Sequence, residues 1–295
     1  MTEKIAIVVV TYNRLALLKE CIPSLRTQTY KADAIIVINN DSTDGTAEWL
    51  KEQTDLQVIH QENIGGAGGF YRGIKEAYEQ GFDWIWVMDD DVEPQHDCLE
   101  NLLAYKAISG CIHPTRKYSD GKLVDGELIW DLSRDSIMFL ENTSYKNGKE
   151  FYTSNNACFE GMLISRTVVD KIGYPDKRFF FVYDDLIYGF FASLYTNVIF
   201  VRSALLIRKK LSSSENWSPL YMYYSHRNKH LVMEYHLKFF PNANHKIIQK
   251  SHLLSPLHTI KMVLKLKNYS WDQKKKLIDA TVRGFLDGRR KKVGR

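Results

Sequence analysis

The first regular stretch of the chain reads Ile5-Ala6-Ile7-Val8-Val9-Val10, and it runs directly into the polar turn Thr11-Tyr12-Asn13-Arg14. A continuous, β-branched apolar run of this length is typical of a parallel strand that is buried on both faces. Apolar residues then recur at helical spacing from Leu15 to Leu25, and Pro23 is expected to disturb or end that helix. The segment therefore predicts a buried strand followed by a helix.

The same alternation continues along the chain. We expect further strands at 34–38, 57–60 and 84–88, separated by helices that begin at Thr46 and after the glycine-rich residues 65–69. This pattern predicts an α/β fold, a mostly parallel sheet sandwiched by helices. Ligands of such sheets bind beyond the carboxyl ends of the strands. The sequence places residues 11–14, 39–41 and 89–91 there.

The composition is that of a globular protein with an ordinary core. The chain has 295 residues, of which 44% are hydrophobic and 25% are charged, which suits about two domains of ~150 residues. Its four cysteines form no CxxC pair, so we expect buried, reduced thiols rather than a zinc site or a disulfide framework. No apolar run reaches the ~18 residues of a membrane-spanning helix, and no signal-peptide pattern is expected at the N-terminus.

Charge is distributed unevenly along the chain. Residues 1–199 contain 19 Lys and Arg against 30 Asp and Glu, whereas residues 200–295 contain 21 against 5. A basic C-terminal third points to an anionic partner, and nucleic acid is disfavoured because no recognised binding module is present. Two interpretations remain, which are peripheral association with an anionic membrane and a solvated helical surface. Five of the nine histidines lie between 226 and 252, at a spacing that favours a basic helix face over a zinc site.

Three consecutive carboxylates, Asp89-Asp90-Asp91, follow the apolar residues 84–88 directly. Mg²⁺ or Mn²⁺ would offset their mutual repulsion, because hard cations prefer oxygen ligands and carry substrate phosphates as further ligands. In extended backbone Asp89 and Asp91 point to the same side, so they are placed to share one metal ion. An acidic surface turn without metal is the alternative, and the preceding apolar run disfavours it.

The glycine-rich stretch at residues 63–73 opens a predicted helix. Small residues let a ligand approach the backbone closely, and a helix N-terminus favours anions. The stretch matches neither the dinucleotide-binding fingerprint nor the phosphate loop of NTPases. Arg72 is within reach of a bound diphosphate, and a flexible turn followed by a solvent-facing arginine is the alternative. Residues 110–155 are polar and turn-rich, and we expect an inserted hairpin or loop region there.

A second pair of carboxylates, Asp184 and Asp185, follows an aromatic run at 179–183. The more enclosed of the two is expected to have a raised pKa, which suits a general base. Carboxylates in the first turn of a helix are the alternative, since Asp is favoured there. The residues alone leave both interpretations open.

In this order, the motifs resemble those of glycosyltransferase family 2, whose members are inverting nucleotide-sugar transferases with a GT-A fold. The resemblance spans roughly residues 4–230 and rests on residues 11–14, 39–46, 89–91 and 179–185. Within the family, residues 63–73 and 88–91 are similar to bacterial galactofuranosyltransferases. The segment Tyr224-Ser225-His226-Arg227-Asn228 is similar to an element found late in many members.

The resemblance implies roles for individual residues. It implies that the nucleotide sugar is bound by Thr11, Tyr12, Arg14, Asn40, Asn63, Gly66, Arg72, Asp89 and Asp90. Asp89 and Asp91 are the implied ligands of Mn²⁺ or Mg²⁺, and Asp185 is the implied general base.

Two positions depart from the family pattern. Many metal-dependent members have a histidine ligand where this chain reads Leu206-Ile207-Arg208-Lys209-Lys210. Either Arg208 or Lys209 contacts the diphosphate instead, or the metal ion is held by fewer protein ligands or is less necessary. Tyr188 stands where many members carry an acidic residue.

The implied activity is transfer of a sugar, which we expect to be galactofuranose from UDP-galactofuranose, to a lipid-linked or polysaccharide acceptor in cell-surface glycan assembly such as O-antigen synthesis. The alternatives are a dTDP-rhamnose-dependent rhamnosyltransferase, a sugar nucleotidyltransferase and a non-catalytic nucleotide-sugar-binding membrane scaffold. We expect a catalytic domain at 1–220, with a nucleotide-sugar half at 1–100 and an acceptor half at 101–220, and then a basic helical region at 221–295. The expected location is cytoplasmic, peripheral at the inner face of the cell membrane.

Overall fold

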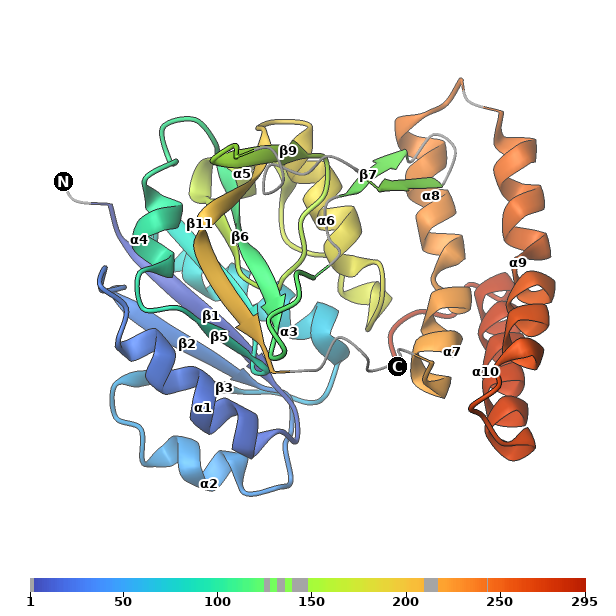
Figure 1. Ribbon diagram of the computed structural model, residues 1–295, viewed down its shortest axis with the longest axis horizontal. Helices are drawn as coiled ribbons and strands as arrows, with labels where there is room; N and C mark the ends of the chain where they lie inside the picture. Colours follow the sequence, from blue (N-terminus) through green and yellow to red (C-terminus); the bar gives the residue numbers. More distant parts are fainter. Residues whose placement is uncertain (1–2, 125–127, 132–135, 140–147, 210–216, 243) are drawn as a thin grey trace.

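A computed structural model of the protein describes residues 3–124, 128–131, 136–139, 148–209, 217–242 and 244–295. Its centre is a nine-stranded sheet (Figure 1). The strands of this sheet are β1 (Ile5–Thr11), β2 (Ala34–Asn39), β3 (Leu56–His60), β4 (Trp84–Asp89), β5 (Val92–Pro94), β6 (Cys111–Tyr118), β9 (Phe151–Ser154), β10 (Met162–Ser165) and β11 (Val198–Arg208). They lie in the order β3-β2-β1-β4-β10-β6-β11-β5, and β9 pairs with β11.

The first half of the sheet is parallel and the second half is mixed. Strands β1 to β4 pair in parallel, and β10 then runs antiparallel to both β4 and β6. Strand β11 is parallel to β6 and antiparallel to β5 and β9. The parallel half brings the carboxyl ends of β1, β2 and β4 to one edge, which is where the sequence predicts the ligand.

Six helices pack on the sheet. They are α1 (Leu15–Arg26), α2 (Thr46–Lys51), α3 (Gly65–Glu79), α4 (Cys98–Leu103), α5 (Arg166–Ile172) and α6 (Asp184–Ser193). Pro23 lies inside α1 and does not end it. With the helices at both faces, the predicted fold class is confirmed.

The period-two alternation of β1 decides which helices cover which face. Ile5, Ile7 and Val9 belong to the core that contains α1 and α4. Ala6 and Val8, on the opposite face, belong to the core that contains α3, α5 and α6. Because both faces are covered, the strand needs no polar residue before Thr11, which explains its unbroken apolar sequence.

The prediction of an insertion at 110–155 is partly wrong. Strand β6 lies inside the sheet, between β10 and β11. The sequence did not reveal this strand because it contains polar residues, and the hydrogen-bond partners of those residues are remote in sequence. Thr115, for example, donates a hydrogen bond to the carbonyl of Val201 at 2.8 Å. The hairpin itself is present as β7 (Leu128–Asp131) and β8 (Ser136–Phe139), and the rest of that segment lies partly outside the described residues.

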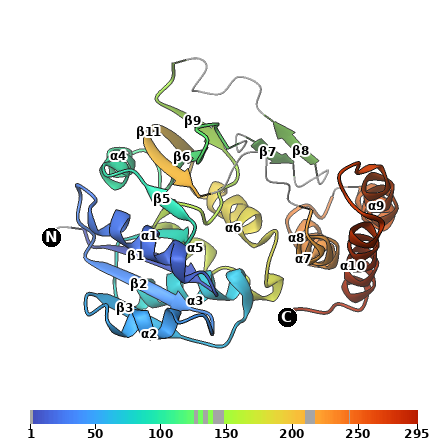
Figure 2. The same ribbon diagram turned by 60° about the horizontal axis from the view of Figure 1, so that its bottom comes forward.

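Four further helices form the C-terminal region, beyond α6 as seen from the sheet (Figures 1 and 2). They are α7 (Pro219–Arg227), α8 (Lys229–Phe239), α9 (His245–Lys265) and α10 (Trp271–Arg289). Helix α10 packs closely on α7, since a Cβ atom on Gly284 would lie 2.2 Å from the carbonyl oxygen of Tyr223. In the described parts of the chain, none of the helices combines the length and the apolar character needed to cross a membrane. The proposed boundaries at 100 and 220 fall inside α4 and α7.

Glycines of α3 allow that helix to approach the sheet, so we predict that filling one of them lowers stability. A Cβ atom on Gly73 would lie 2.2 Å from Cγ1 of Val8, inside the core. The variant Gly73→Ala should lower the free energy of unfolding by about 1–3 kcal/mol, the usual cost of overpacking. Gly66→Ala in the same helix is the control, because a Cβ atom there meets nothing within 4 Å. Chemical denaturation measures both, and equal values for the two variants would contradict the prediction.

Candidate active site

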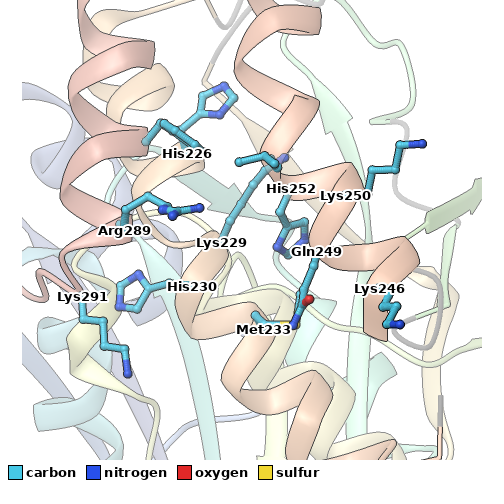
Figure 3. Close-up of a pocket in the computed structure, with 13 residues that line it drawn as sticks. His226, Lys229, His230, Met233, Lys246, Gln249, Lys250, His252, Arg289 and Lys291 are labelled. Carbon is cyan, nitrogen blue, oxygen red and sulfur yellow. The ribbon is translucent and has the colours of Figure 1, made fainter. Parts of the chain in front are cut away.

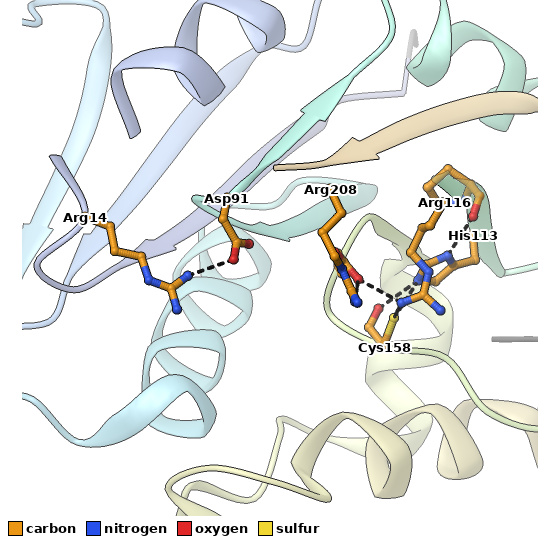
Figure 4. A network of polar contacts seen from close by, with 8 residues as sticks. Arg14, Asp91, His113, Arg116, Cys158 and Arg208 are labelled. Atoms are coloured by element: carbon orange, nitrogen blue, oxygen red, sulfur yellow. Dashed lines mark hydrogen bonds and ion pairs between the residues drawn. The ribbon is translucent and has the colours of Figure 1, made fainter. Parts of the chain in front are cut away.

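The carboxyl ends of β1 and β4 meet through side chains of the predicted site. Thr11 Oγ1 donates a hydrogen bond of 2.7 Å to Asp90 Oδ2. Arg14 Nη1 lies 3.1 Å from Asp90 Oδ1 and 3.0 Å from Asp91 Oδ2 (Figure 4). Burial raises the pKa of Asp90 to about 6, against the opposing charge of Arg14. Arg14 thus bridges two of the three carboxylates.

The backbone of the triplet differs from our expectation. Strand β4 ends at Asp89, and Asp90 and Asp91 form a turn before β5 begins. The alternation of side chains along a strand therefore does not extend across the triplet. Asp89 is half-buried, and burial together with the charges of Asp91 and Glu160 raises its pKa well above the ordinary value.

The triplet offers oxygen donors of the kind that bind a hard metal ion. Among the described residues, no three His, Cys, Asp or Glu side chains are grouped so as to hold a metal ion. The carboxylates of Asp89 and Asp91 are nevertheless hard oxygen donors, and excess negative charge gathers around Asp89. This donor set fits Mg²⁺ or Mn²⁺ bound together with substrate oxygens and water, rather than enclosed by protein ligands alone.

The carboxyl end of β2 is joined to the start of α3. The side-chain amide of Asn40 donates to the carbonyl of Gly65 at 3.1 Å and accepts a hydrogen bond from Gln61 at 2.6 Å. Asn63 Oδ1 accepts from the backbone N–H of Gly65 at 3.0 Å. Both asparagines therefore shape the glycine-rich stretch. Gly66 is the position in it that leaves open space around its Cα.

Two predicted residues lie apart from this cluster. Arg72 is exposed and pairs with Glu76 one turn further along α3, at 3.4 Å. Tyr12 is exposed at the turn after β1. Among the described residues, neither side chain forms a hydrogen bond or ion pair with Thr11, Arg14 or Asp90.

Asp184 and Asp185 begin helix α6, after a loop with unusual backbone geometry. Phe180, Val182 and Tyr183 have φ angles of 64°, 71° and 73°, which bulky residues rarely adopt. Burial and the charge of Asp185 raise the pKa of Asp184 to about 8, and burial also raises the pKa of Asp185. Both carboxylates therefore lie in the first turn of a helix and also have raised pKa values, and the role of general base stays a prediction.

The strained loop is held by Arg227 and Asn228, at the end of α7. Asn228 Nδ2 lies 3.1, 2.7 and 2.9 Å from the carbonyl oxygens of Phe179, Phe181 and Val182. Arg227 Nη2 donates to the carbonyl of Phe179 at 2.6 Å, and its guanidinium contacts Asn228 Oδ1. Both side chains are buried. The late Arg-Asn element thus sets the position from which Asp185 emerges.

Glu160 links the two groups of carboxylates, and sequence reasoning missed it. Its carboxylate accepts hydrogen bonds from Arg116, at 2.8 Å, and from Arg208. Burial opposes ionisation, but these two arginines hold the pKa of Glu160 below its ordinary value. The charge of Glu160 raises the pKa of both Asp89 and Asp185, so it lies near the triplet and near the predicted base.

The neighbouring thiol does not form a nucleophile. Cys158 Sγ lies 2.8 Å from Arg116 Nη1 and 3.2 Å from His113 Nε2. Burial raises the pKa of the Cys158 thiol to about 12 and lowers that of His113 to about 3. Both are therefore neutral near pH 7. All four cysteines are unpaired, as expected.

The residues that depart from the family pattern have structural partners. Arg208 pairs with Glu160, and Lys209 pairs with Glu93 and, at 3.1 Å, with Glu20. The backbone N–H of Lys209 donates to the carbonyl of Asp91 at 2.8 Å, so the substituted segment lies beside the triplet. Tyr188 is a core residue whose hydroxyl donates to the carbonyl of Gly173.

Comparison with solved structures supports the fold. The chain superposes on S. aureus TarS 1–349 in complex with UDP with a TM-score of 0.60 and 14% identity, covering 98% of this chain and 92% of that one. It superposes on GalNAc-T7 with UDP, GalNAc and Mn²⁺ with a TM-score of 0.61 and 15% identity, covering 98% of this chain and 56% of that one.

Comparison of sequences identifies the family. The galactofuranosyltransferases GlfT1 of Mycolicibacterium smegmatis and Mycobacterium tuberculosis (strain H37Rv) are 29% and 30% identical, over 61% and 63% of this chain. The matches span 62% and 63% of those relatives' own lengths. The model of "Glycosyl transferase family 2" matches residues 6–173, which is more than half of the chain. The protein therefore belongs to glycosyl transferase family 2.

Proposed function

We propose that the protein transfers galactofuranose from UDP-galactofuranose to a hydroxyl group of a lipid-linked or polysaccharide acceptor, with inversion at the anomeric carbon. One observation carries the proposal, which is the meeting of Thr11, Arg14 and the triplet at the strand ends, with Glu160 near both Asp89 and Asp185. Family membership supports sugar transfer, and the names of the mycobacterial relatives support the donor.

In this proposal the donor binds over the carboxyl ends of β1, β2 and β4. Asp89 and Asp91 hold Mn²⁺ or Mg²⁺, which when bound neutralises the diphosphate of the leaving group. Arg14 is at the same edge and adds a positive charge there. The open backbone at Gly66, in the first turn of α3, leaves room for the donor.

The acceptor side is assigned to Asp185. Its carboxylate takes the proton of the acceptor hydroxyl, while the acceptor oxygen bonds to the anomeric carbon and the bond to UDP breaks. The products are UDP and the new glycoside, and no covalent enzyme intermediate is needed. A raised pKa suits this role, because general-base catalysis is most efficient when the pKa lies near the working pH.

We also propose that the protein associates peripherally with an anionic membrane through its C-terminal helices. Residues 200–295 carry 21 Lys and Arg against 5 Asp and Glu. Lys and Arg that face an anionic leaflet contribute about 1 kcal/mol each to binding.

The donor assignment predicts which nucleotide is released. With Mn²⁺ and a galactan or lipid-linked acceptor, the protein should release UDP from UDP-galactofuranose and no dTDP from dTDP-rhamnose, as measured by a coupled nucleotide assay. UDP-glucose is the matched control for the sugar. Release of dTDP would replace the donor with dTDP-rhamnose. Binding of UDP-galactofuranose without transfer to any acceptor would favour a non-catalytic scaffold.

Replacing the proposed base should affect turnover and not donor binding. Asp185→Asn should lower kcat by roughly 10²–10⁴-fold, the usual range for loss of a general base, with the donor Kd from calorimetry unchanged. Asp170→Asn, at a surface carboxylate on α5 that bonds Tyr78, is the control and should leave kcat intact.

The pH profile of the wild-type protein provides a second readout of the same base. The base must be deprotonated, so kcat should fall as the pH drops through the raised pKa of Asp185, at a pH above the ordinary ~3.9 of aspartate. This acid limb should be absent from the residual activity of Asp185→Asn. A limb that stays in the variant would assign the base to another residue.

The Asn228 contacts predict a positioning role. In Asn228→Asp the side chain keeps its size but loses both N–H donors, and it faces three carbonyl oxygens. The loop before Asp185 should shift, and displacements of about 1 Å at a reacting group can cost ~10²-fold in kcat. The donor KM should change little, because the donor-binding residues lie on other loops. Asn101→Ala on α4 is the control, and an equal loss in kcat and donor affinity for Asn228→Asp would indicate general unfolding instead.

A further inference from the structure

The four C-terminal helices border an open cavity that the proposed transfer reaction does not use. Its volume is about 550 Å³, and residues from α7, α8, α9 and α10 line it. Its lining includes Lys229 of α8, Lys246 and Lys250 of α9, Arg289 of α10 and Lys291, which are labelled in Figure 3. Cavities of this size are typical of sites for small molecules or headgroups.

The positive charge of this cavity is not balanced by its walls. No Asp or Glu is among its lining residues. The nearby carboxylates of α10 are engaged elsewhere, since Asp279 pairs with Arg283, and Asp287 pairs with Arg290 and Lys292. Cations drawn together around a cavity repel one another, so an anion bound there is stabilised by all of them.

A buried nitrogen in the cavity wall lacks a partner. His230 lines the cavity, and its Nδ1 lies 2.7 Å from the carbonyl oxygen of Arg227, so Nδ1 carries a proton. Its Nε2 is buried and has no hydrogen-bond partner among the described residues. A buried polar atom of this kind costs free energy until a ligand satisfies it. A phosphate group can do so in either protonation state of the ring, because it offers acceptor oxygens and, when monoanionic, a donor hydroxyl.

The second histidine of the wall is already satisfied. His226 Nε2 lies 3.1 Å from Thr259 Oγ1, and its Nδ1 lies 3.4 Å from Ser255 Oγ. Burial and the charge of Lys229 lower the pKa of His226 to about 4, so it is neutral near pH 7. The features that remain for a ligand are therefore the unpartnered Nε2 of His230 and the cationic side chains of Lys246, Lys250, Arg289 and Lys291.

Exposed leucines adjoin the basic residues of α9. Positions 250, 253, 257 and 264 recur at helical spacing, so they lie on one side of the helix. The side chains at the last three are exposed, with Leu253 at 50%, Leu257 at 58% and Leu264 at 46%. Leu253 also lines the cavity. A free inorganic anion needs no apolar neighbour, whereas a lipid headgroup at a bilayer surface has one.

We propose that this cavity binds the phosphate group of a membrane lipid, with the leucines of α9 entering the bilayer interface. The inference deepens the proposed membrane association and is independent of the sugar donor. It replaces a diffuse attraction between basic residues and an anionic leaflet with one defined site.

The test compares vesicles of phosphatidylcholine that contain either phosphatidic acid or sulfatide at equal negative charge. The full-length protein should float with the phosphatidic acid vesicles and bind the sulfatide vesicles far more weakly. Lys246→Ala/Lys250→Ala should weaken phosphatidic acid binding by about 25-fold, since each lysine contributes about 1 kcal/mol and 1.4 kcal/mol is tenfold. Lys275→Ala/Lys276→Ala, with the same charge change at exposed positions of α10 outside the cavity, should lose much less.

Each other outcome overturns the proposal. Equal losses for the two double variants would mean a diffuse basic surface, and equal binding to both vesicles would mean that phosphate is not recognised. Binding of inorganic phosphate by calorimetry without vesicle binding would assign the site to a free anion, and preferential binding of an oligonucleotide would assign it to nucleic acid.

The variant Leu257→Ser tests the role of the leucines, and a transfer assay tests whether the lipid site is independent of sugar transfer. Leu257→Ser should weaken vesicle binding, and full retention of binding would contradict the role of the leucines. Transfer to a soluble acceptor should be unchanged in Lys246→Ala/Lys250→Ala. Failure of the proposed transfer reaction would thus leave the vesicle result intact, and the two proposals fail separately.

Discussion

The site depends on one electrostatic constraint, which is that carboxylates are crowded at one edge of the sheet and must be balanced there. An ionised carboxylate removed from water without a partner is strongly destabilising. Arg14 balances Asp90 and Asp91, and Arg116 and Arg208 balance Glu160. Among the described residues neither Asp89 nor Asp185 forms an ion pair, and burial raises the pKa of both. One of the two proposed metal ligands and the proposed base are thus the carboxylates without an ion-pair partner.

The parallel half of the fold was predictable because its signals are local. An apolar run such as residues 5–10 can hardly be anything but a buried strand, and the glycines of α3 mark a close approach to it. Strand β6 was missed because its sequence mixes polar with apolar residues. Thr115 and Arg116 are satisfied by Val201 and Glu160, and nothing near them in sequence reveals those partners.

The site shows the same difference between residues marked by local sequence signals and residues whose partners are distant in sequence. Thr11, Arg14 and Asp90 follow strand ends, so topology alone brings them together. Glu160 follows no recognisable motif, and its importance arises from two arginines that are 44 and 48 residues away. Asn40 illustrates a different limit, because its amide was expected at the nucleotide and in the structure bonds Gly65 and Gln61. A residue type indicates what a side chain can bond, and only the fold decides with which partner.

Arg227 connects two parts of the molecule that have been described separately. Its guanidinium holds the backbone ahead of Asp185, whereas its carbonyl oxygen accepts the Nδ1 proton of His230 and would lie 2.6 Å from a Cβ atom on Gly288. Arg227 therefore contacts both the helical bundle and the loop of the sheet domain. The loop that precedes Asp185 and the bundle that carries the proposed lipid site are thus joined through the backbone and side chain of a single residue.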